Sequence, residues 1–243
     1  MSIRLVPQSD LCYFYDGSLD GLLCCVFAAF RDRALPGRMA LLCGAQLSFA
    51  ERAQQIPTDP AIAERVQQGI LSRIGPEALA RVQLAARCPA ADAPRTVLRY
   101  LALGFETGPR VDQRLTEPVV ARMDAMLRLL NREAMHWQQF LRFAQLANGV
   151  FHADFAPEHD LLTLLIPYFA DRFGAQPFLL HDSGRRVAAA WDGVRWRVGS
   201  TSGVRMPANH ADEAAWQALW RTFYDAVAIR QRLNPKLRRN FMP

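Results

Sequence analysis

Prolines divide the middle of the chain into helical segments, and this punctuation limits the possible folds more than any other feature. Pro60 begins a segment that runs to about residue 73, and Pro76 begins another that runs to about residue 88. Proline suits the first turn of a helix because the amide hydrogen that it lacks would have no partner there. We therefore expect two consecutive short helices in this part of the chain.

Two further helices are expected before residue 140. The first covers 96–105 and is stopped by Gly104 and Gly108, and the second follows Glu117-Pro118. The longer helix has an apolar stripe at helical spacing, formed by Val119, Met123, Met126, Leu127, Leu130, Ala134 and Trp137. Together the four segments predict a helical subregion at about 61–139.

The N-terminal part predicts a strand, a turn and a helix. Residues 12–15 form a short aromatic strand, which the Asp16-Gly17 pair interrupts. Ser18 is a suitable N-cap because its hydroxyl can accept a hydrogen bond from a first-turn amide. Apolar residues then recur at helical spacing over 19–30, and we expect the Pro36-Gly37 pair to end this unit.

The C-terminal third is expected to mix strands with helices. Residues 140–146 and 150–155 predict a hairpin around Asn148-Gly149, and a helix is expected within 157–173. A last helix is expected over about 211–229. Three more strands should form an antiparallel meander over 178–181, 186–191 and 194–198.

Asp192-Gly193 is a strong signal for a two-residue hairpin turn, because both central positions of such a turn need positive φ. This turn predicts the pairs Trp191 with Val194, Ala189 with Trp196, and Val187 with Val198. One face of the hairpin is then apolar. The other face carries Arg186, Arg195 and Arg197 beside Ala188 and Ala190.

These elements predict an α+β protein that forms a single domain over 1–243. The helical subregion at about 61–139 should pack on a mainly antiparallel sheet. We expect the C-terminal third to supply most of this sheet and the N-terminal part to add one short strand.

The composition is that of a globular protein, with 51% hydrophobic and 21% charged residues, which is enough for a buried core. No apolar run approaches the roughly 18 residues that span a bilayer. The N-terminus also lacks the apolar core of a signal peptide. We therefore expect a soluble, cytoplasmic protein with no membrane partner.

The sequence predicts neither a cofactor nor a metal site. Its five cysteines have no paired spacing, so neither a disulfide framework nor a zinc ribbon is indicated. The usual motifs of nucleotide hydrolases, dinucleotide enzymes, zinc peptidases and serine hydrolases are absent. Glu133 and His136 have the spacing of a di-iron ligand pair, but such bundles need a second pair. We expect His136 to have an orienting or packing role.

The positive charge is concentrated at the C-terminal end. Of the formal net charge of +6, residues 221–243 contribute +5, a distribution that suggests an anionic partner. Asn234-Pro235 should interrupt any helix there, because the residue before proline disfavours helical geometry. We expect this segment to contact nucleic acid or an acidic partner through Arg230, Arg232, Lys236, Arg238 and Arg239. Arg186, Arg195 and Arg197 are expected to contact phosphates in the same way. The alternative is that both surfaces are merely solvated.

Four residues near strand ends are the candidates for catalysis. His152 and Asp154 share one face of a strand because side chains alternate along it, and His181-Asp182 ends another strand. If they converge, they could form an acid–base or metal cluster. Ordinary capping and turn roles are the alternative for each residue taken singly.

The loop Asp16-Gly17-Ser18 is a candidate contact for a ligand or partner. It follows Tyr15 at a strand end and precedes a helix N-terminus, where free amides favour a polar ligand. Asp16 opposes a directly bound anion. We therefore expect it to hold a base edge, a sugar hydroxyl or a partner's cation, unless it serves only the turn.

Several segments in order along nearly the whole chain resemble a bacterial family described as probable DNA metabolism proteins, otherwise a domain of unknown function. The resembling segments are Tyr15-Asp16-Gly17-Ser18 and Gly21 to Phe27; Tyr100 to Phe105; Glu133 with His136 and Phe140-Leu141-Arg142-Phe143; Asp154 to Leu162 with Pro167-Tyr168-Phe169; His181-Asp182; and Arg232 to Leu237 with Phe241-Met242-Pro243. Relatives often continue beyond the last of these segments with Tyr, Trp and basic residues.

The resemblance implies a role in DNA modification or repair. Members of the family are typically encoded beside a DNA-repair radical SAM protein, and some are fused to a uracil-DNA-glycosylase-like domain. We therefore expect a nucleic-acid-binding accessory protein with DNA and one of these proteins as partners. The alternatives are an enzyme that acts on a damaged base or nucleotide through the His/Asp cluster, and a scaffold without a ligand of its own.

Overall fold

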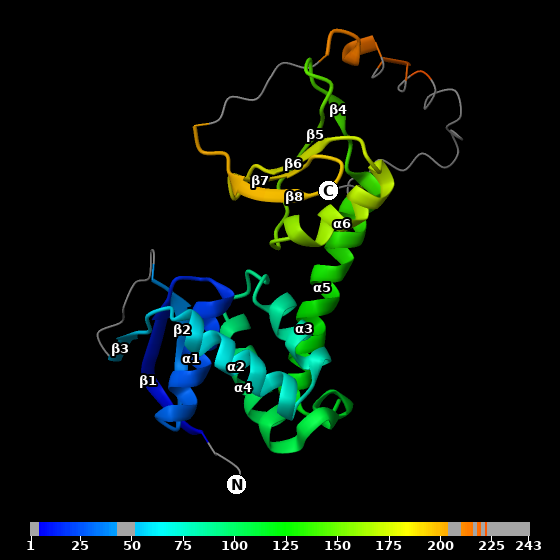
Figure 1. Ribbon diagram of the computed structural model, residues 1–243. Coiled ribbons are helices and arrows are strands. Elements are labelled where there is room, and N and C mark those ends of the chain that lie inside the picture. The colour runs from blue at the N-terminus through cyan, green and yellow to red at the C-terminus, as the bar shows by residue number, and fades with distance from the viewer. Residues whose placement is uncertain (1–4, 43–51, 204–209, 216–217, 220–221, 223–243) are drawn as a thin grey trace. The chain divides into compact units, whose positions relative to one another are not determined.

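The computed structural model describes residues 5–42, 52–203, 210–215, 218, 219 and 222 (Figure 1). The chain divides into two compact units, Met1–Leu130 and Asn131–Pro243, and the boundary falls within a long helix. Helices dominate the middle, and a mainly antiparallel sheet lies in the second unit, which confirms the predicted α+β class. A single domain over the whole chain stays a prediction.

The first unit contains a three-stranded parallel sheet in the order β2-β1-β3. These strands are β1 (Val6–Tyr15), β2 (Ala34–Leu41) and β3 (Arg52–Gln55). The predicted N-terminal strand is thus the centre of a sheet of its own, paired on both sides within the first unit. Its second half is buried throughout, as expected for a strand covered on both faces.

Helix α1 (Leu19–Arg31) begins at the predicted N-cap. The Ser18 hydroxyl accepts a hydrogen bond from the Gly21 amide at 2.9 Å, which satisfies one of the free first-turn donors. Cys24 and Cys25 are buried on this helix and pack as small apolar side chains.

The Pro36-Gly37 pair lies inside strand β2, so the prediction that it ends the N-terminal unit was wrong. β2 is an edge strand, where a proline without an amide hydrogen is tolerated. The register between β1 and β2 shifts between Gln8 and Cys12, as at a β-bulge. A Cβ atom on Gly37 would lie 2.3 Å from the Ser9 carbonyl oxygen, so this close approach requires glycine.

All four helices predicted in the middle of the chain form, but the third begins at Ala93 instead of residue 96 and continues past Gly104 to Thr107. They are α2 (Pro60–Arg73), α3 (Pro76–Ala85), α4 (Ala93–Thr107) and α5 (Pro118–Phe140), with a 3-10 turn η1 (Gly108–Gln113) after α4. Each of the three prolines that the sequence marked stands at the first residue of its helix. Apolar side chains of α1 to α5 form one buried core with β1, and its members include Ile70, Val82, Val97, Leu101 and Met123.

The second unit contains a five-stranded sheet in the order β4-β5-β6-β7-β8. The strands are β4 (Ala144–Gln145), β5 (Phe151–Phe155), β6 (Phe178–Asp182), β7 (Val187–Trp191) and β8 (Trp196–Ser200). Every neighbouring pair is antiparallel except β5 and β6, which are parallel. Because parallel strands need a crossover, the chain between them forms helix α6 (Leu162–Phe173).

Helix α6 packs on one face of this sheet through aromatic contacts. Phe173 of α6 contacts Phe151 and Phe178, and Phe143 contacts the rings of Phe169, Phe173 and Phe178. Phe151 and Phe178 are paired residues, so they point to the same side of the sheet. The core of the second unit therefore lies on this side.

The hairpin of β7 and β8 forms, but its predicted register was wrong by two residues. Trp191 pairs with Trp196, and a four-residue loop, 192–195, replaces the two-residue turn. The Asp192 carboxylate accepts hydrogen bonds from the amides of Val194 and Arg195, which stabilises the wider loop. A shift of two residues preserves which side chains share a face.

The helix predicted over 211–229 lies mostly outside the described residues. Where the chain is described, its start is helical at 213–215. His210 and Glu213 bond the backbone of Gln145 in β4. None of the described helices is both long and apolar enough to cross a membrane.

We predict that Gly193→Ala destabilises the second unit by about 2 kcal/mol, because forced overpacking costs roughly 1–3 kcal/mol. Gly193 has φ of 98°, and a Cβ there would lie 2.5 Å from the Ala175 carbonyl oxygen. Gly199→Ala in neighbouring β8 is the matched control, because a Cβ there meets nothing within 4 Å. Urea unfolding followed by tryptophan fluorescence measures both variants, and equal midpoints would contradict the prediction.

Candidate functional site

The parallel pair β5 and β6 brings three of the four candidate catalytic residues together. His152 and Asp154 alternate along β5 and share one face of the sheet. His181 is the register partner of Asp154 on β6, so it lies on the same face. The three side chains, which we call the His–Asp–His cluster, lie on the side opposite to Phe151 and Phe178. Asp154 and His181 are the penultimate residues of two parallel strands, and the carboxyl ends of parallel strands are where ligands bind in open sheets.

His181 is held at both of its ring nitrogens. Its Nδ1 lies 2.6 Å from Asp154 Oδ1, and its Nε2 lies 3.0 Å from Thr201 Oγ1. Because an ionised carboxylate can only accept, the Nδ1–H donates to Asp154 and Nε2 is left to accept from the Thr201 hydroxyl. This arrangement orients an imidazole base between a carboxylate and a hydroxyl, as in nucleophilic catalytic triads.

His152 is the buried member of the cluster. Its side chain is 9% exposed, and its ring stacks on that of His181 with centroids 6.2 Å apart. Its Nε2 lies 3.4 Å from Asp154 Oδ1, yet no described residue forms a hydrogen bond with it. Burial lowers the pKa of His152 despite the nearby carboxylate of Asp154, so the neutral ring is favoured near pH 7.

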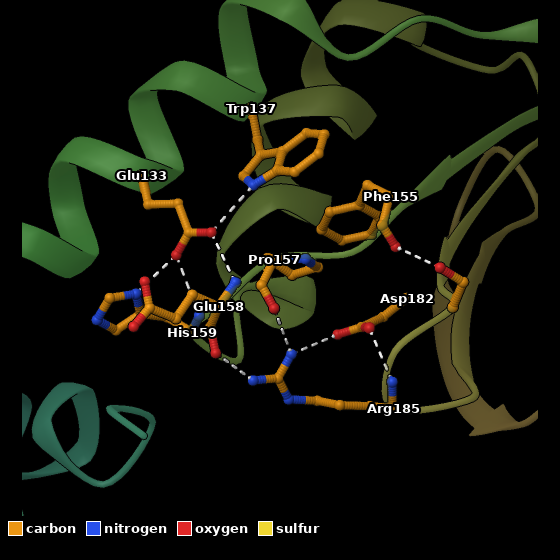
Figure 2. A network of polar contacts seen from close by, with 9 residues as sticks. Glu133, Trp137, Phe155, Pro157, Glu158, His159, Asp182 and Arg185 are labelled. Carbon is orange, nitrogen blue, oxygen red and sulfur yellow. Dashed lines mark hydrogen bonds and ion pairs between the residues drawn. The ribbon is translucent and has the colours of Figure 1, made fainter. Parts of the chain in front are cut away.

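The fourth candidate, Asp182, lies on the opposite face. Adjacent residues of a strand point to opposite sides, so Asp182 cannot join His181 in the cluster. It is 1% exposed and accepts hydrogen bonds from the Arg185 amide and guanidinium, both at 3.0 Å. Arg185 also donates to the carbonyl oxygens of Pro157 and Glu158 (Figure 2). Asp182 therefore orients Arg185, which in turn stabilises the loop that follows β5.

Glu133 anchors the same loop from helix α5. Its carboxylate accepts hydrogen bonds from the amides of Glu158 and His159, from the His159 ring at 2.6 Å, and from the Trp137 indole (Figure 2). Burial alone would raise the pKa of Glu133, but the bonds from His159, Glu158 and Trp137 outweigh it and lower the pKa. Glu133 thus acts on His159 rather than on His136, whose ring contacts Phe140.

The three arginines expected to contact phosphates are exposed but lie on different kinds of segment. Arg186 lies in the β6–β7 turn with φ of 54°, and Arg195 lies in the β7–β8 loop. Arg197 is in strand β8, paired with Ala190. The basic residues Arg230, Arg232, Lys236, Arg238 and Arg239 lie outside the described residues.

The carboxylate of the loop Asp16-Gly17-Ser18 already accepts hydrogen bonds within the protein. The Asp16 carboxylate accepts from the Ser18 amide at 2.9 Å, the Ser18 hydroxyl at 2.6 Å and the Thr58 hydroxyl at 2.8 Å. The Ser18 bonds are the main cause of the lowered pKa of Asp16. These contacts join the start of α1 to the loop before α2, and a ligand role for Asp16 stays a prediction.

Sequence reasoning missed Thr201 and Arg185. Thr201 lies 20 residues beyond His181, and no local pattern marks a threonine as a partner of a distant imidazole. It also missed a cavity of about 240 Å³ between α1, α2 and α4, where Arg65 and Arg73 lie over the rings of Phe27 and Phe105. This cavity is apolar apart from those arginines and the Glu106 side chain.

The fold and site together define a mixed α+β protein whose polar cluster sits at the carboxyl ends of two parallel strands. Residues 91–243 match the family described as a domain of unknown function, DUF4130, and the chain belongs to this family. The match includes the His–Asp–His cluster and the Glu133 network, and it leaves out the Asp16 loop. The chain matches no protein whose function has been curated.

We predict that Glu133→Gln destabilises the second unit by about 1–3 kcal/mol at pH 7, the cost of unsatisfied buried donors. A carboxyl group whose pKa is lower in the folded than in the unfolded chain stabilises the native state at pH values above its unfolded-state pKa. That contribution is lost as the pH falls through the native pKa. The difference in urea midpoint between wild type and Glu133→Gln should therefore shrink below about pH 4.5, the ordinary value for Glu. Glu158→Gln, which removes an exposed carboxylate from the same loop, should change little, and a pH-independent difference for Glu133→Gln would contradict the argument.

Proposed function

We propose that this protein binds nucleic acid and acts in DNA metabolism as an accessory protein in DNA repair or modification. The observation that carries the proposal is one face of the second sheet, which carries both the His–Asp–His cluster, on β5 and β6, and Arg197, on β8. Paired residues form the row His152, Leu179, Ala190 and Arg197 across four strands.

The shape of this face supports the proposal. Between the cluster and Arg197, strand β7 contributes the small residues Ala188 and Ala190 to this face. At roughly 4.8 Å per strand, β8 lies about 10 Å from the His181 strand. A phosphate held by Arg197 would therefore leave the neighbouring part of a nucleic acid within reach of the cluster.

The charge distribution supports the same partner. All five residues of strand β8, including Arg197, are exposed. Arg195, in the loop before β8, and Arg186, in the β6–β7 turn, are exposed as well. The C-terminal segment adds five further positive charges from residue 230 on. Phosphate contacts of this kind supply most of the sequence-independent affinity of nucleic-acid-binding proteins.

The resemblance to DNA metabolism proteins names the expected partners. A DNA-repair radical SAM protein or a uracil-DNA-glycosylase-like protein would perform the chemistry, and this chain would deliver or hold the DNA. The Asp16 loop is the proposed contact for such a partner, because it lies in the first unit, whereas the proposed DNA-binding face belongs to the second.

A second candidate is an enzyme that acts on a damaged base or nucleotide. The geometry of His181, oriented by Asp154 and within reach of the Thr201 hydroxyl, favours it. General acid–base catalysis needs an imidazole whose tautomer is fixed by such a partner.

We predict a steep salt dependence of duplex DNA binding, measured by fluorescence anisotropy at several KCl concentrations. Four or five phosphate contacts from the C-terminal segment contribute about −4 to the log–log slope, and three contacts from Arg186, Arg195 and Arg197 contribute about −3 more. Changing Arg232, Lys236, Arg238 and Arg239 to Ala should remove most of the first contribution. Changing Arg186, Arg195 and Arg197 to Ala should reduce the slope by about 3, since each contact contributes about 0.9.

A charge-matched control separates these contacts from general electrostatics. Arg99, Arg110 and Arg128 are exposed arginines of the first unit, and their replacement by Ala should leave the slope unchanged. If all three variants lose affinity equally, the binding is diffuse and the proposed face is not the binding surface. If none does, the charge excess has no role in nucleic-acid binding.

The enzyme candidate makes a different prediction. With a uracil-containing duplex as the probe, wild type should release a modified product, while His181→Ala should bind the duplex equally well and lose turnover by about 100-fold or more, the scale of general acid–base catalysis. Product formation is followed by gel electrophoresis after alkali treatment. Equal turnover of both proteins, or none in either, would exclude this use of the cluster on that substrate.

A further inference from the structure

We propose that the His–Asp–His cluster is a binding site for one divalent metal ion, with Zn²⁺ as the ion that its donors suit best. The residues are His152, Asp154 and His181. The inference is independent of the proposed DNA binding, because metal binding is measured without nucleic acid.

The donor set is the first argument. Each of the three residues can offer one ligand atom such that all three atoms lie within 4.8 Å of one another. Among the described residues this is the one group of His, Cys, Asp and Glu with that property. Two imidazoles and one carboxylate form the ligand set of many catalytic zinc sites, in which a fourth position is left to water.

The second argument is the unused nitrogen of His152. Its Nε2 is buried, faces Asp154, and has no hydrogen-bond partner among the residues that the structure describes. A buried polar atom without a partner destabilises the folded protein, so its persistence needs an explanation. Coordination to a metal ion would satisfy it, and an acid–base pair formed by His181 and Asp154 alone would not.

The surroundings of His181 provide the third argument. A metal-bound imidazole usually donates its other ring N–H to an acceptor that fixes its orientation. Thr201 Oγ1 lies 3.0 Å from Nε2 of His181 and can accept that bond. When the metal takes Nδ1, the proton that Nδ1 shares with Asp154 moves to Nε2, and the Thr201 hydroxyl turns from donor to acceptor.

The distances require only small adjustments. In a tetrahedral site with zinc bonds near 2.05 Å, ligand atoms lie about 3.3 Å apart. His152 Nε2 is already 3.4 Å from Asp154 Oδ1, and His181 Nδ1 at 2.6 Å must move away by about 0.7 Å to reach that spacing. Asp154 is 59% exposed, so its side chain can rotate and the ion can enter from solvent.

Such a site would supply hydrolytic chemistry to the face that carries Arg197. Zinc with three protein ligands binds a water whose pKa falls to near 7. A substrate phosphate or base held beside the cluster would then meet a metal-bound hydroxide. This substrate class, unlike the metal site itself, rests on the proposed function of the face, and it implies hydrolysis of a nucleotide or nucleic acid.

The test is isothermal titration calorimetry of the untagged, chelator-treated full chain with ZnCl₂ at pH 7.5. We expect one Zn²⁺ per chain. His152→Ala and Asp154→Asn should each weaken binding by at least about 100-fold, since even partners of ligand residues change affinity by 10–100-fold. His136→Ala is the matched control, because it removes an imidazole of α5 outside the cluster and should bind as wild type does.

Co²⁺ absorption supplies a readout that separates this site from binding by cysteines. Tetrahedral nitrogen and oxygen ligands give visible bands without the strong thiolate band, and these bands should disappear in Asp154→Asn. Asp154 is exposed, so this variant should fold even if His152→Ala does not. The proposal would be overturned if the wild-type chain did not bind Zn²⁺ or if its Co²⁺ complex showed a thiolate band. It would also be overturned if Asp154→Asn and His136→Ala lost the same amount of Zn²⁺ affinity.

Discussion

The parallel pairing of β5 with β6 is the constraint on which the candidate site depends. It sets Asp154 opposite His181 and puts both beside His152 on one face. A slip of one residue would turn the β6 side chains over, exchanging His181 for Asp182 on the cluster face and burying an imidazole against the aromatic core. The rest of the second unit holds this register, through the aromatic packing of α6 on one side and the hydrogen bonds of the loops that follow both strands.

Two charged side chains stabilise those loops by satisfying backbone groups. Glu133 accepts from amides of the loop after β5, and Arg185 donates to carbonyl oxygens of the same loop while it pairs with Asp182 at the end of β6. Glu133 thus satisfies backbone donors, and Arg185 satisfies backbone acceptors, of the same short segment, residues 157–159. Asp182, a catalytic candidate in the sequence, therefore has a scaffold role together with Glu133, whereas the less conspicuous Thr201 contacts the cluster.

Local features could be predicted from the sequence, and features that depend on distant pairing could not. Prolines, the Ser18 cap and apolar spacing act within a few residues, so α1, α2, α3 and α5 begin where expected. Pro36-Gly37 predicts a turn, because the close approach of Gly37 to Ser9 in the neighbouring strand cannot be seen in the sequence. The Asp192 side chain stabilises a four-residue loop where the Asp-Gly pair alone predicts a two-residue turn. Strand alternation predicted that His152 and Asp154 share a face. The pairing of their strand with that of His181, the exclusion of Asp182, and the choice of His159 as the partner of Glu133, 26 residues away, need the tertiary fold.

The crossover through α6 also determines when the cluster can exist. Its two halves lie on strands that are separated by a helix, because parallel strands need a crossover connection of about a dozen residues or more. Non-local pairing of this kind is slow, because the chain loses loop entropy before the contacts form. During synthesis β5 is complete long before β6 and Thr201 emerge, so the nascent chain exposes His152 and Asp154 without a partner. The chemistry of this protein, whichever ligand it takes, is therefore among the last properties that the folding chain acquires.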